Sequence, residues 1–209
     1  MQYGISIPNF GDYCQPRTVA ELAHEAEQAG WDGCFVWDHM GFALHFPEPI
    51  ADPWVLLSAI AMRTGRVRLG PMVTPVARRR PWTLARQCVS LDQLSDGRLI
   101  FGAGLGHPAD AEFEVFGEEG DARVRARKLD EGLDVLAGLL SGEPFSYDGE
   151  YQHIDDVTFL PRPVQARIPI WIAGIWPSRA PFRRAARWDG VFPLSANAGL
   201  EGSMPLADL

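Results

Sequence analysis

The pair Asp38-His39 follows directly on three large apolar residues, Phe35-Val36-Trp37. A short apolar run of this kind is typical of a buried strand, so the pair is predicted to stand at a strand end. Histidine titrates near neutral pH and often serves as a general acid or base. One interpretation makes His39 a proton-transfer group, with Asp38 orienting it or binding a hydrogen of a substrate or cofactor. The other makes the two residues a satisfied polar pair that ends a strand.

A glycine-rich segment, Gly102-Ala103-Gly104-Leu105-Gly106-His107, also follows an apolar run. The dinucleotide fingerprint G-x-G-x-x-G would need glycine where His107 stands, and this disfavours a Rossmann site. Glycines without Cβ atoms would instead let a flat group lie against the backbone. We therefore expect the segment to face a planar ligand.

A third stretch, Gly174-Ile175-Trp176, stands between an apolar run and a predicted helix. Backbone N–H groups and the positive end of a helix dipole can bind phosphate in such a place. The alternative is an ordinary strand-to-helix turn.

Metal and nucleophile chemistry is poorly supported by the spacing of the residues. His39, His45 and Glu48 could suggest a metal site, but no H-E-x-x-H or similar pattern is present, and we expect no metal. The number of cysteines is odd, and no two of Cys14, Cys34 and Cys88 form a C-x-x-C pair. This argues against a disulfide scaffold and against a thiolate zinc site. The sequence also lacks the G-x-S-x-G elbow of a hydrolase.

The net charge of −8 argues against a nucleic-acid partner. The one basic run, Arg78-Arg79-Arg80, could contact an anionic ligand, but we favour a solvated loop. No signal-peptide pattern opens the chain, and the longest uncharged apolar stretch, around 168–177, is too short for a bilayer. We therefore expect a cytoplasmic protein without a membrane partner.

The elements that must position these residues alternate along the chain. Strands are predicted at 3–7, 33–37, 67–73, 99–102, 168–173 and 190–194. Helices are predicted at 17–29, at 53–64 and at 178–187. A further helix begins at Pro81, and a long one carries Leu129, Leu133, Leu136 and Leu140 on one face. The first four strands recur about every thirty residues, which is the size of a βα unit. Nearly continuous apolar runs indicate a parallel sheet, so the pattern predicts an α/β fold, doubly wound or barrel. A hairpin is predicted near 145–155, around Asp148-Gly149, and 209 residues suit one domain.

Several motifs occur together in one order, and the ordered set is what carries a family resemblance. They are YGISIPN at 3–9, AEQAGWDGCFVWDHM at 26–40, DPWVLLSAIAMRTGRVRLGPMVTP at 52–75, RRPWTLARQCVSLDQLSDGRLIFGAGLG at 79–106, EFEVFG at 112–117, PRPVQ at 161–165, IPIWIAG at 168–174 and AARWDGVFP at 185–193. With these motifs the chain resembles the bacterial-luciferase-like superfamily of flavin- and deazaflavin-dependent oxidoreductases, over residues 1 to about 195.

The resemblance implies a TIM-type (β/α)8 barrel with a cofactor ring in its carboxyl-end mouth. It implies a non-proline cis peptide at Met72-Val73, a cofactor-binding role for Met72, Val73 and Thr74, and cofactor contacts along Gly104, Leu105, Gly106 and His107. It places the cofactor phosphate at Gly174, Ile175 and Trp176, and assigns catalysis to Asp38, His39 and His107. The implied cofactor is FMN, for monooxygenation through a flavin peroxide, or the deazaflavin coenzyme F-420, for hydride transfer to or from a small organic substrate.

Two departures from the family pattern shape the expectation. Deazaflavin-using sugar-phosphate dehydrogenases resemble this chain but carry a glutamate where His107 stands, so we do not expect that substrate. Relatives also continue for about two more βα units, so we expect residues 1–209 to form one shortened barrel domain with about six core strands. The alternative is a non-catalytic flavin-binding protein or structural subunit.

Two further expectations concern the pocket and the assembly. Trp37, Phe42, Phe46 and Trp176 could line an apolar substrate pocket, although core packing explains each equally well. A homodimer is expected, by resemblance and because exposed barrel edges need cover.

Overall fold

The computed structural model describes residues 1–41 and 48–196. The strands form two sheets in which every neighbouring pair is parallel, and a separate hairpin. The first sheet has the order β1 (Gly4–Ile7), β2 (Gly33–Val36), β3 (Arg68–Pro71), and the second has β4 (Thr74–Pro75), β5 (Phe101–Gly104), β8 (Ile170–Trp176), β9 (Gly190–Ser195). The predicted α/β class and the parallel strands are confirmed.

The two sheets are joined between β3 and the segment that leads into β5. Leu69 and Leu99 form a parallel bridge, and Leu69 donates to the Arg98 carbonyl at 3.1 Å and accepts from Ile100 at 2.8 Å. The strands therefore form one continuous wall that runs from β1 to β9. Within residues 1–41 and 48–196, β1 and β9 end the strand order and do not pair, so the (β/α)8 barrel stays a prediction.

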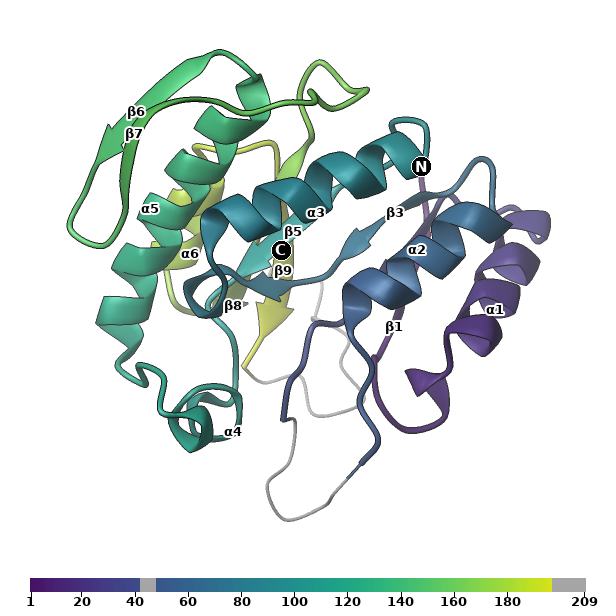
Figure 1. The fold of residues 1–209 in the computed structure, drawn as a ribbon. Helices are drawn as coiled ribbons and strands as arrows, with labels where there is room; N and C mark the ends of the chain where they lie inside the picture. The colour runs from purple at the N-terminus through teal and green to yellow at the C-terminus, as the bar shows by residue number, and fades with distance from the viewer. Residues whose placement is uncertain (42–47, 197–209) are drawn as a thin grey trace.

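Helices cover one face of this wall (Figure 1). In chain order they are α1 (Pro16–Gln28), α2 (Pro53–Arg63), α3 (Pro81–Leu94), α5 (Ala122–Ser141) and α6 (Ala180–Ala185). Proline begins α1, α2 and α3, because its fixed φ suits the first turn and its missing N–H costs nothing there. The side chains of Asp52 and Asp121 accept the free N–H groups that open α2 and α5.

The core lies between the wall and the helices. Leu57 and Ile60 of α2, Leu84 of α3 and Leu133 of α5 are fully buried, as is Phe101 of β5. Burying a side chain of this size stabilises the fold by about 1.5–3 kcal/mol. This packing holds the strand ends, and with them the polar residues that follow, in fixed places.

The predicted hairpin is present as β6 (Pro144–Asp148) and β7 (His153–Thr158). Its second strand begins at His153. The Glu131 carboxylate of α5 accepts the N–H groups of Glu150, Tyr151 and Gln152 at 2.8–3.0 Å. These three N–H groups are therefore bonded to α5 and do not pair within the hairpin.

Three predicted strands differ from the structure by more than one residue at the carboxyl edge. The predicted strand 67–73 breaks between β3 and β4 at a non-proline cis peptide, Met72-Val73. The fourth strand extends to Gly104, which pairs with Pro75 of β4, and the fifth extends to Trp176, which pairs with Ser195 of β9. No helix in the described part of the chain is long and apolar enough to span a membrane.

Candidate active site at the carboxyl edge of the wall

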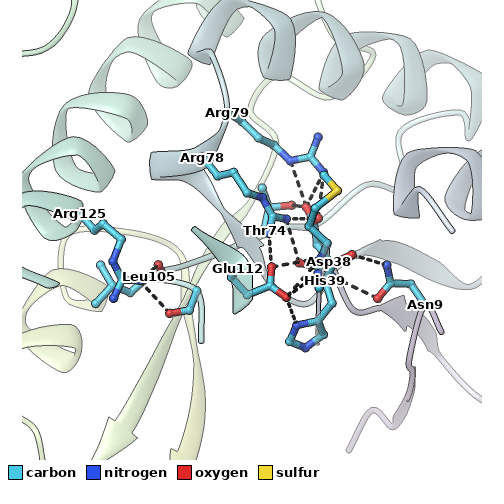
Figure 2. A network of polar contacts seen from close by, with 12 residues as sticks. Asn9, Asp38, His39, Thr74, Arg78, Arg79, Leu105, Glu112 and Arg125 are labelled. Atoms are coloured by element: carbon cyan, nitrogen blue, oxygen red, sulfur yellow. Dashed lines mark hydrogen bonds and ion pairs between the residues drawn. The ribbon is translucent and has the colours of Figure 1, made fainter. Parts of the chain in front are cut away.

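Asp38 follows β2 and is the centre of a buried ionic cluster (Figure 2). Its carboxylate accepts two hydrogen bonds of 2.8 Å, one from Arg78 Nη2 and one from Arg79 Nη2, and a third of 3.1 Å from Arg79 Nε. Thr74 Oγ1 donates a further bond of 2.9 Å. Charge-assisted bonds of this geometry are the strong ones in proteins, so Asp38 fixes β4 and the turn after it against the end of β2.

His39 is held by a carboxylate that lies far away in the sequence. Its Nδ1 lies 2.8 Å from Oε1 of Glu112, the last residue of the one-turn helix α4 (Ala109–Glu112). The Glu112 side chain is 1% exposed, and it also accepts from the N–H groups of Met40 and Gly41 and from Arg78 Nη1. Glu112 therefore fixes both the imidazole and the backbone that follows it.

Asn9, after β1, fixes the backbone of His39. Its Oδ1 accepts the His39 N–H at 3.1 Å, and its Nδ2 donates to the carbonyls of His39 and Ala51 at 2.9 and 2.8 Å. The ring of His39 meets Phe10 and Trp37 edge to face, with centroids 6.1 and 5.8 Å apart. The imidazole is therefore positioned by the ends of two strands and by α4.

The cluster is neutral as a set, since Asp38 and Glu112 oppose Arg78 and Arg79. Burial by itself would raise the pKa of Glu112, but the His39 hydrogen bond, the Arg78 charge and the Met40 N–H outweigh it and lower that pKa. Buried carboxylates need such partners to remain ionised. Glu112 is thus an ionised acceptor at neutral pH.

The expectation of a solvated loop at Arg78-Arg79-Arg80 is wrong for two of the three residues. The side chains of Arg78 and Arg79 are only 7% and 15% exposed, because the 3-10 turn η2 (Val76–Arg78) directs them at Asp38 and Glu112. Arg80 alone is exposed, with its guanidinium 5.5 Å from the Trp82 ring centroid.

The glycine-rich segment lies on the neighbouring strand end. A Cβ on Gly104 would come within 2.5 Å of Val73 Cγ2, so glycine is needed there for the close approach of the Val73 side chain. Buried Arg125 of α5 donates to the carbonyls of Leu105 and Gly106 at 2.8 and 3.0 Å. Arg125, which the sequence reasoning missed, therefore fixes the backbone at the carboxyl end of the segment.

His107 is exposed and precedes a cis bond to Pro108. Gly174, Ile175 and Trp176 lie inside β8, where they pair with Pro193, Leu194 and Ser195 of β9. They therefore extend the wall, and α6 begins only at Ala180. The cofactor roles predicted for these residues, as for Met72, Val73 and Thr74, stay predictions.

The aromatic residues proposed for the pocket divide into two groups. Trp37 donates from Nε1 to Ser6 Oγ at 2.9 Å and lies beside His39, whereas Trp176 packs edge to face on Phe182. Phe42, Phe46 and the metal candidate His45 fall outside the described residues. Among the residues that the structure describes, no three His, Cys, Asp or Glu side chains are grouped as a metal site would need.

Two residues of the cluster had only weak signals in the sequence. Glu112 begins the EFEVFG motif, where an acidic residue precedes the fully buried Phe113, but nothing local relates it to His39, 73 residues earlier. Asn9 ends the first strand motif as a single polar residue. Only the parallel strand order brings both to the Asp38-His39 pair.

The family model for luciferase-like monooxygenases matches residues 1–202. An F420-dependent glucose-6-phosphate dehydrogenase of Nakamurella multipartita is 32% identical over 94% of this chain. A second one, from Amycolatopsis mediterranei, is 32% identical over 95% of it. The chain spans 56% and 58% of these two relatives, so it corresponds to little more than half of each.

Solved structures give the same result. The monooxygenase RslO1 of Streptomyces bottropensis has a TM-score of 0.74 at 31% identity, covering 90% of this chain and 57% of that one. An F420-dependent secondary alcohol dehydrogenase, solved with an F420-acetone adduct, has a TM-score of 0.80 at 25% identity, covering 93% and 57%. With the family match over nearly the whole chain, these likenesses establish that the protein belongs to the luciferase-like monooxygenase family.

Proposed function

We propose that this chain serves an oxidoreductase that uses coenzyme F-420 or FMN on a small organic substrate, with His39 as the proton-transfer residue. The observation that carries the proposal is the placement of His39. It stands at a strand end on the carboxyl edge, where parallel α/β folds bind ligands, and a buried carboxylate orients its ring.

The strand ends next to the cluster suit a flat ring. Gly104 of β5 lies against Val73, between β3 and β4, and against Ala173 of β8, since a Cβ on Gly104 would be 2.5 Å from Val73 and 3.5 Å from Ala173. Small apolar residues of this kind give a planar surface without polar groups. Thr74, next to Val73, is bonded to Asp38, next to His39, so the surface and the imidazole are tied together.

The cofactor residues that we propose are those of the sequence analysis. Met72, Val73, Thr74 and the segment 104–106 would hold the ring, and 174–176 would lie nearer its phosphate. When bound, F-420 supplies two-electron hydride transfer, and reduced FMN supplies oxygen activation. The protein's part is to position the substrate, to exclude water, and to take or give a proton at the imidazole of His39.

F-420 is the first choice among the two cofactors. The two glucose-6-phosphate dehydrogenases compared above match more of this chain than the two solved structures do, and they are named as F420-dependent. This supports hydride transfer. FMN remains the second choice, because RslO1 is a monooxygenase and is as similar in sequence. A sugar phosphate is not the substrate that we propose, because His107 occupies the place of the glutamate expected for that class.

A binding protein without catalysis is less well supported. Such a protein has no need to commit a buried carboxylate and an arginine to the orientation of one imidazole. We also propose that residues 1–209 belong to a single barrel domain, and the homodimer and the cytoplasmic location stay predictions.

The test is a titration of the purified chain with F-420 and with FMN, each oxidised and reduced, followed by absorbance and fluorescence. We expect saturable binding of one of the two. Binding of neither would overturn the proposal for this chain.

Catalysis is tested on the cofactor that binds, with a panel that includes secondary alcohols, aldehydes and glucose 6-phosphate. We expect His39→Ala to lower the rate by about 10²- to 10⁴-fold with cofactor affinity unchanged. The control is His153→Ala, which removes an exposed histidine that also pairs with a carboxylate, at 2.7 Å from Asp148. Equal rates in the two variants would argue against His39.

A further inference from the structure

We propose that Glu112 holds His39 with a proton on Nδ1, and that Arg78 fixes Glu112 in place for this contact. Glu112 and Arg78 are then positioning residues that act through His39. The use of this device in catalysis rests on the proposed function, but the tautomer is a property of the chain alone.

The first argument is the set of partners around Glu112. Oε1 contacts His39 Nδ1 at 2.8 Å and the Gly41 N–H at 3.3 Å, and Oε2 contacts the Met40 N–H at 3.1 Å and Arg78 Nη1. An ionised carboxylate only accepts hydrogen bonds, and the backbone N–H groups and Arg78 can only donate. His39 Nδ1 completes the set only as an N–H donor.

The second argument is the rigidity of the arrangement. Glu112 is 1% exposed, so water cannot take over its role. The loop after His39 is packed directly on α4, since a Cβ on Gly41 would come within 2.6 Å of the Ala111 carbonyl oxygen. The carboxylate therefore cannot move away from Nδ1 without moving both segments.

The third argument is the balance of charge. Arg78 bonds Glu112 through Nη1, and bonds the carboxylate and the carbonyl of Asp38 through Nη2, at 2.8 and 3.2 Å. Arg79 supplies the second cation. In the described part of the chain, the charged groups linked to the His39 ring are Glu112 directly, Arg78 through it, and Asp38 and Arg79 beyond. Two carboxylates and two guanidinium groups cancel, so Glu112 can remain an ionised acceptor in a buried place.

The chemical consequence concerns the other ring nitrogen. A neutral imidazole with its proton on Nδ1 has its basic lone pair on Nε2. Protons would therefore pass at Nε2, and Glu112 would stabilise the imidazolium that forms when Nε2 accepts one. The arrangement resembles in its logic a histidine oriented by a buried aspartate in a catalytic triad.

The test is long-range ¹H–¹⁵N NMR of the imidazoles in ¹⁵N-labelled protein without cofactor, near pH 7. His39→Gln identifies the signal of His39 by its loss. We expect a proton on Nδ1 in the wild type. A ring whose only proton is on Nε2 would overturn the proposal even if the cofactor binds as proposed.

Glu112→Ala and Arg78→Met test the separate parts, and two further variants serve as controls. Glu112→Ala should give a mixture of tautomers, and Arg78→Met should weaken the preference for a proton on Nδ1, whereas Arg78→Lys should restore it. Asp148→Ala, which removes the carboxylate of the exposed histidine pair, should leave the His39 signals unchanged. Wild-type signals for His39 in Glu112→Ala or Arg78→Met would contradict the assigned role, and the wild-type spectrum decides the tautomer if a variant does not fold.

The loaded enzyme supplies an independent readout. We expect Glu112→Ala to lower kcat by about 10- to 100-fold, the range found for partners that orient metal-binding histidines. We expect KM to change less. Comparable losses through kcat and KM would indicate a structural role only.

Discussion

Thr74 Oγ1 donates a hydrogen bond of 2.9 Å to Asp38 Oδ2, and this bond links the two parts of the site. Thr74 follows Val73, whose side chain lies against Gly104, and Asp38 precedes His39. The surface proposed for the cofactor ring and the imidazole proposed for proton transfer therefore depend on one buried carboxylate. Asp38 is a buried support between them, and its predicted catalytic role stays a prediction.

Asp38→Asn should destabilise the fold strongly. The substitution leaves Arg78 and Arg79 facing a neutral amide in a buried place, and removing one partner of a buried ion pair costs about 3–5 kcal/mol. Guanidinium denaturation measures the free energy of unfolding. Asp148→Asn is the matched control, since its side chain is 95% exposed, and it should change little. If Asp38→Asn lowered the free energy of unfolding as little as Asp148→Asn, the buried cluster would add nothing to stability.

Glu112 should make stability fall on acidification. Its pKa is lowered in the folded protein, because the His39 bond, the Arg78 charge and backbone N–H groups outweigh burial, which alone would raise it. Its contribution is complete above the ordinary glutamate pKa, about 4.3, and is lost as pH falls through the lowered value. The free energy of unfolding of the wild type should therefore decrease more steeply below about pH 5 than that of Glu112→Gln.

The comparison of the two pH series removes the contribution of other carboxyl groups. Glu27, whose pKa is also lowered, is present in both proteins and cancels. Denaturation curves measured every half unit of pH give the slopes. Parallel slopes would mean that the ionisation of Glu112 is not linked to folding.

Arg125→Met should weaken cofactor binding more than it weakens the fold. Arg125 holds the carbonyls of Leu105 and Gly106 and lies 4.6 Å from the Phe113 ring centroid. Hydrogen bonds from a charged group are worth about 1.5–3 kcal/mol, so an affinity loss of about 10- to 100-fold is expected. Titration with the cofactor measures it.

The control for this prediction lies in the same helix. Arg123 is exposed, so Arg123→Met changes the charge of α5 equally without touching the glycine-rich segment. It should bind the cofactor as the wild type does. Equal losses in the two variants would assign the effect to helix charge and not to the two carbonyls.

Cys14 should react with a thiol reagent well before the other two cysteines. It is only partly buried, whereas burial raises the pKa of Cys34 to about 12 and raises that of Cys88 further. The thiolate is the reactive form, so buried thiols with raised pKa values are inert. Labelling near pH 8 followed by mass spectrometry should find one modified thiol, and all three after denaturation. Early labelling of Cys88 would contradict the packing of α3.

The sequence determined the elements and which polar residues end them. Apolar runs located the parallel strands, the second predicted helix begins at Pro53 as α2 does, and Asp38-His39 was correctly placed beyond β2. These are local properties, since strand burial, helix capping and φ preferences depend on a few neighbouring residues. The ordered motifs identified the family for the same reason.

Only the tertiary structure decided which groups meet. The sequence predicted a solvated loop at Arg78 and Arg79, because a sequence does not show which carboxylates a turn will face. Glu112 reaches His39 across 73 residues only because β2 and the segment after β5 end on the same edge of the wall. Pairing between distant buried charges depends on strand order and on the absence of water, and neither is a property of a local stretch of sequence.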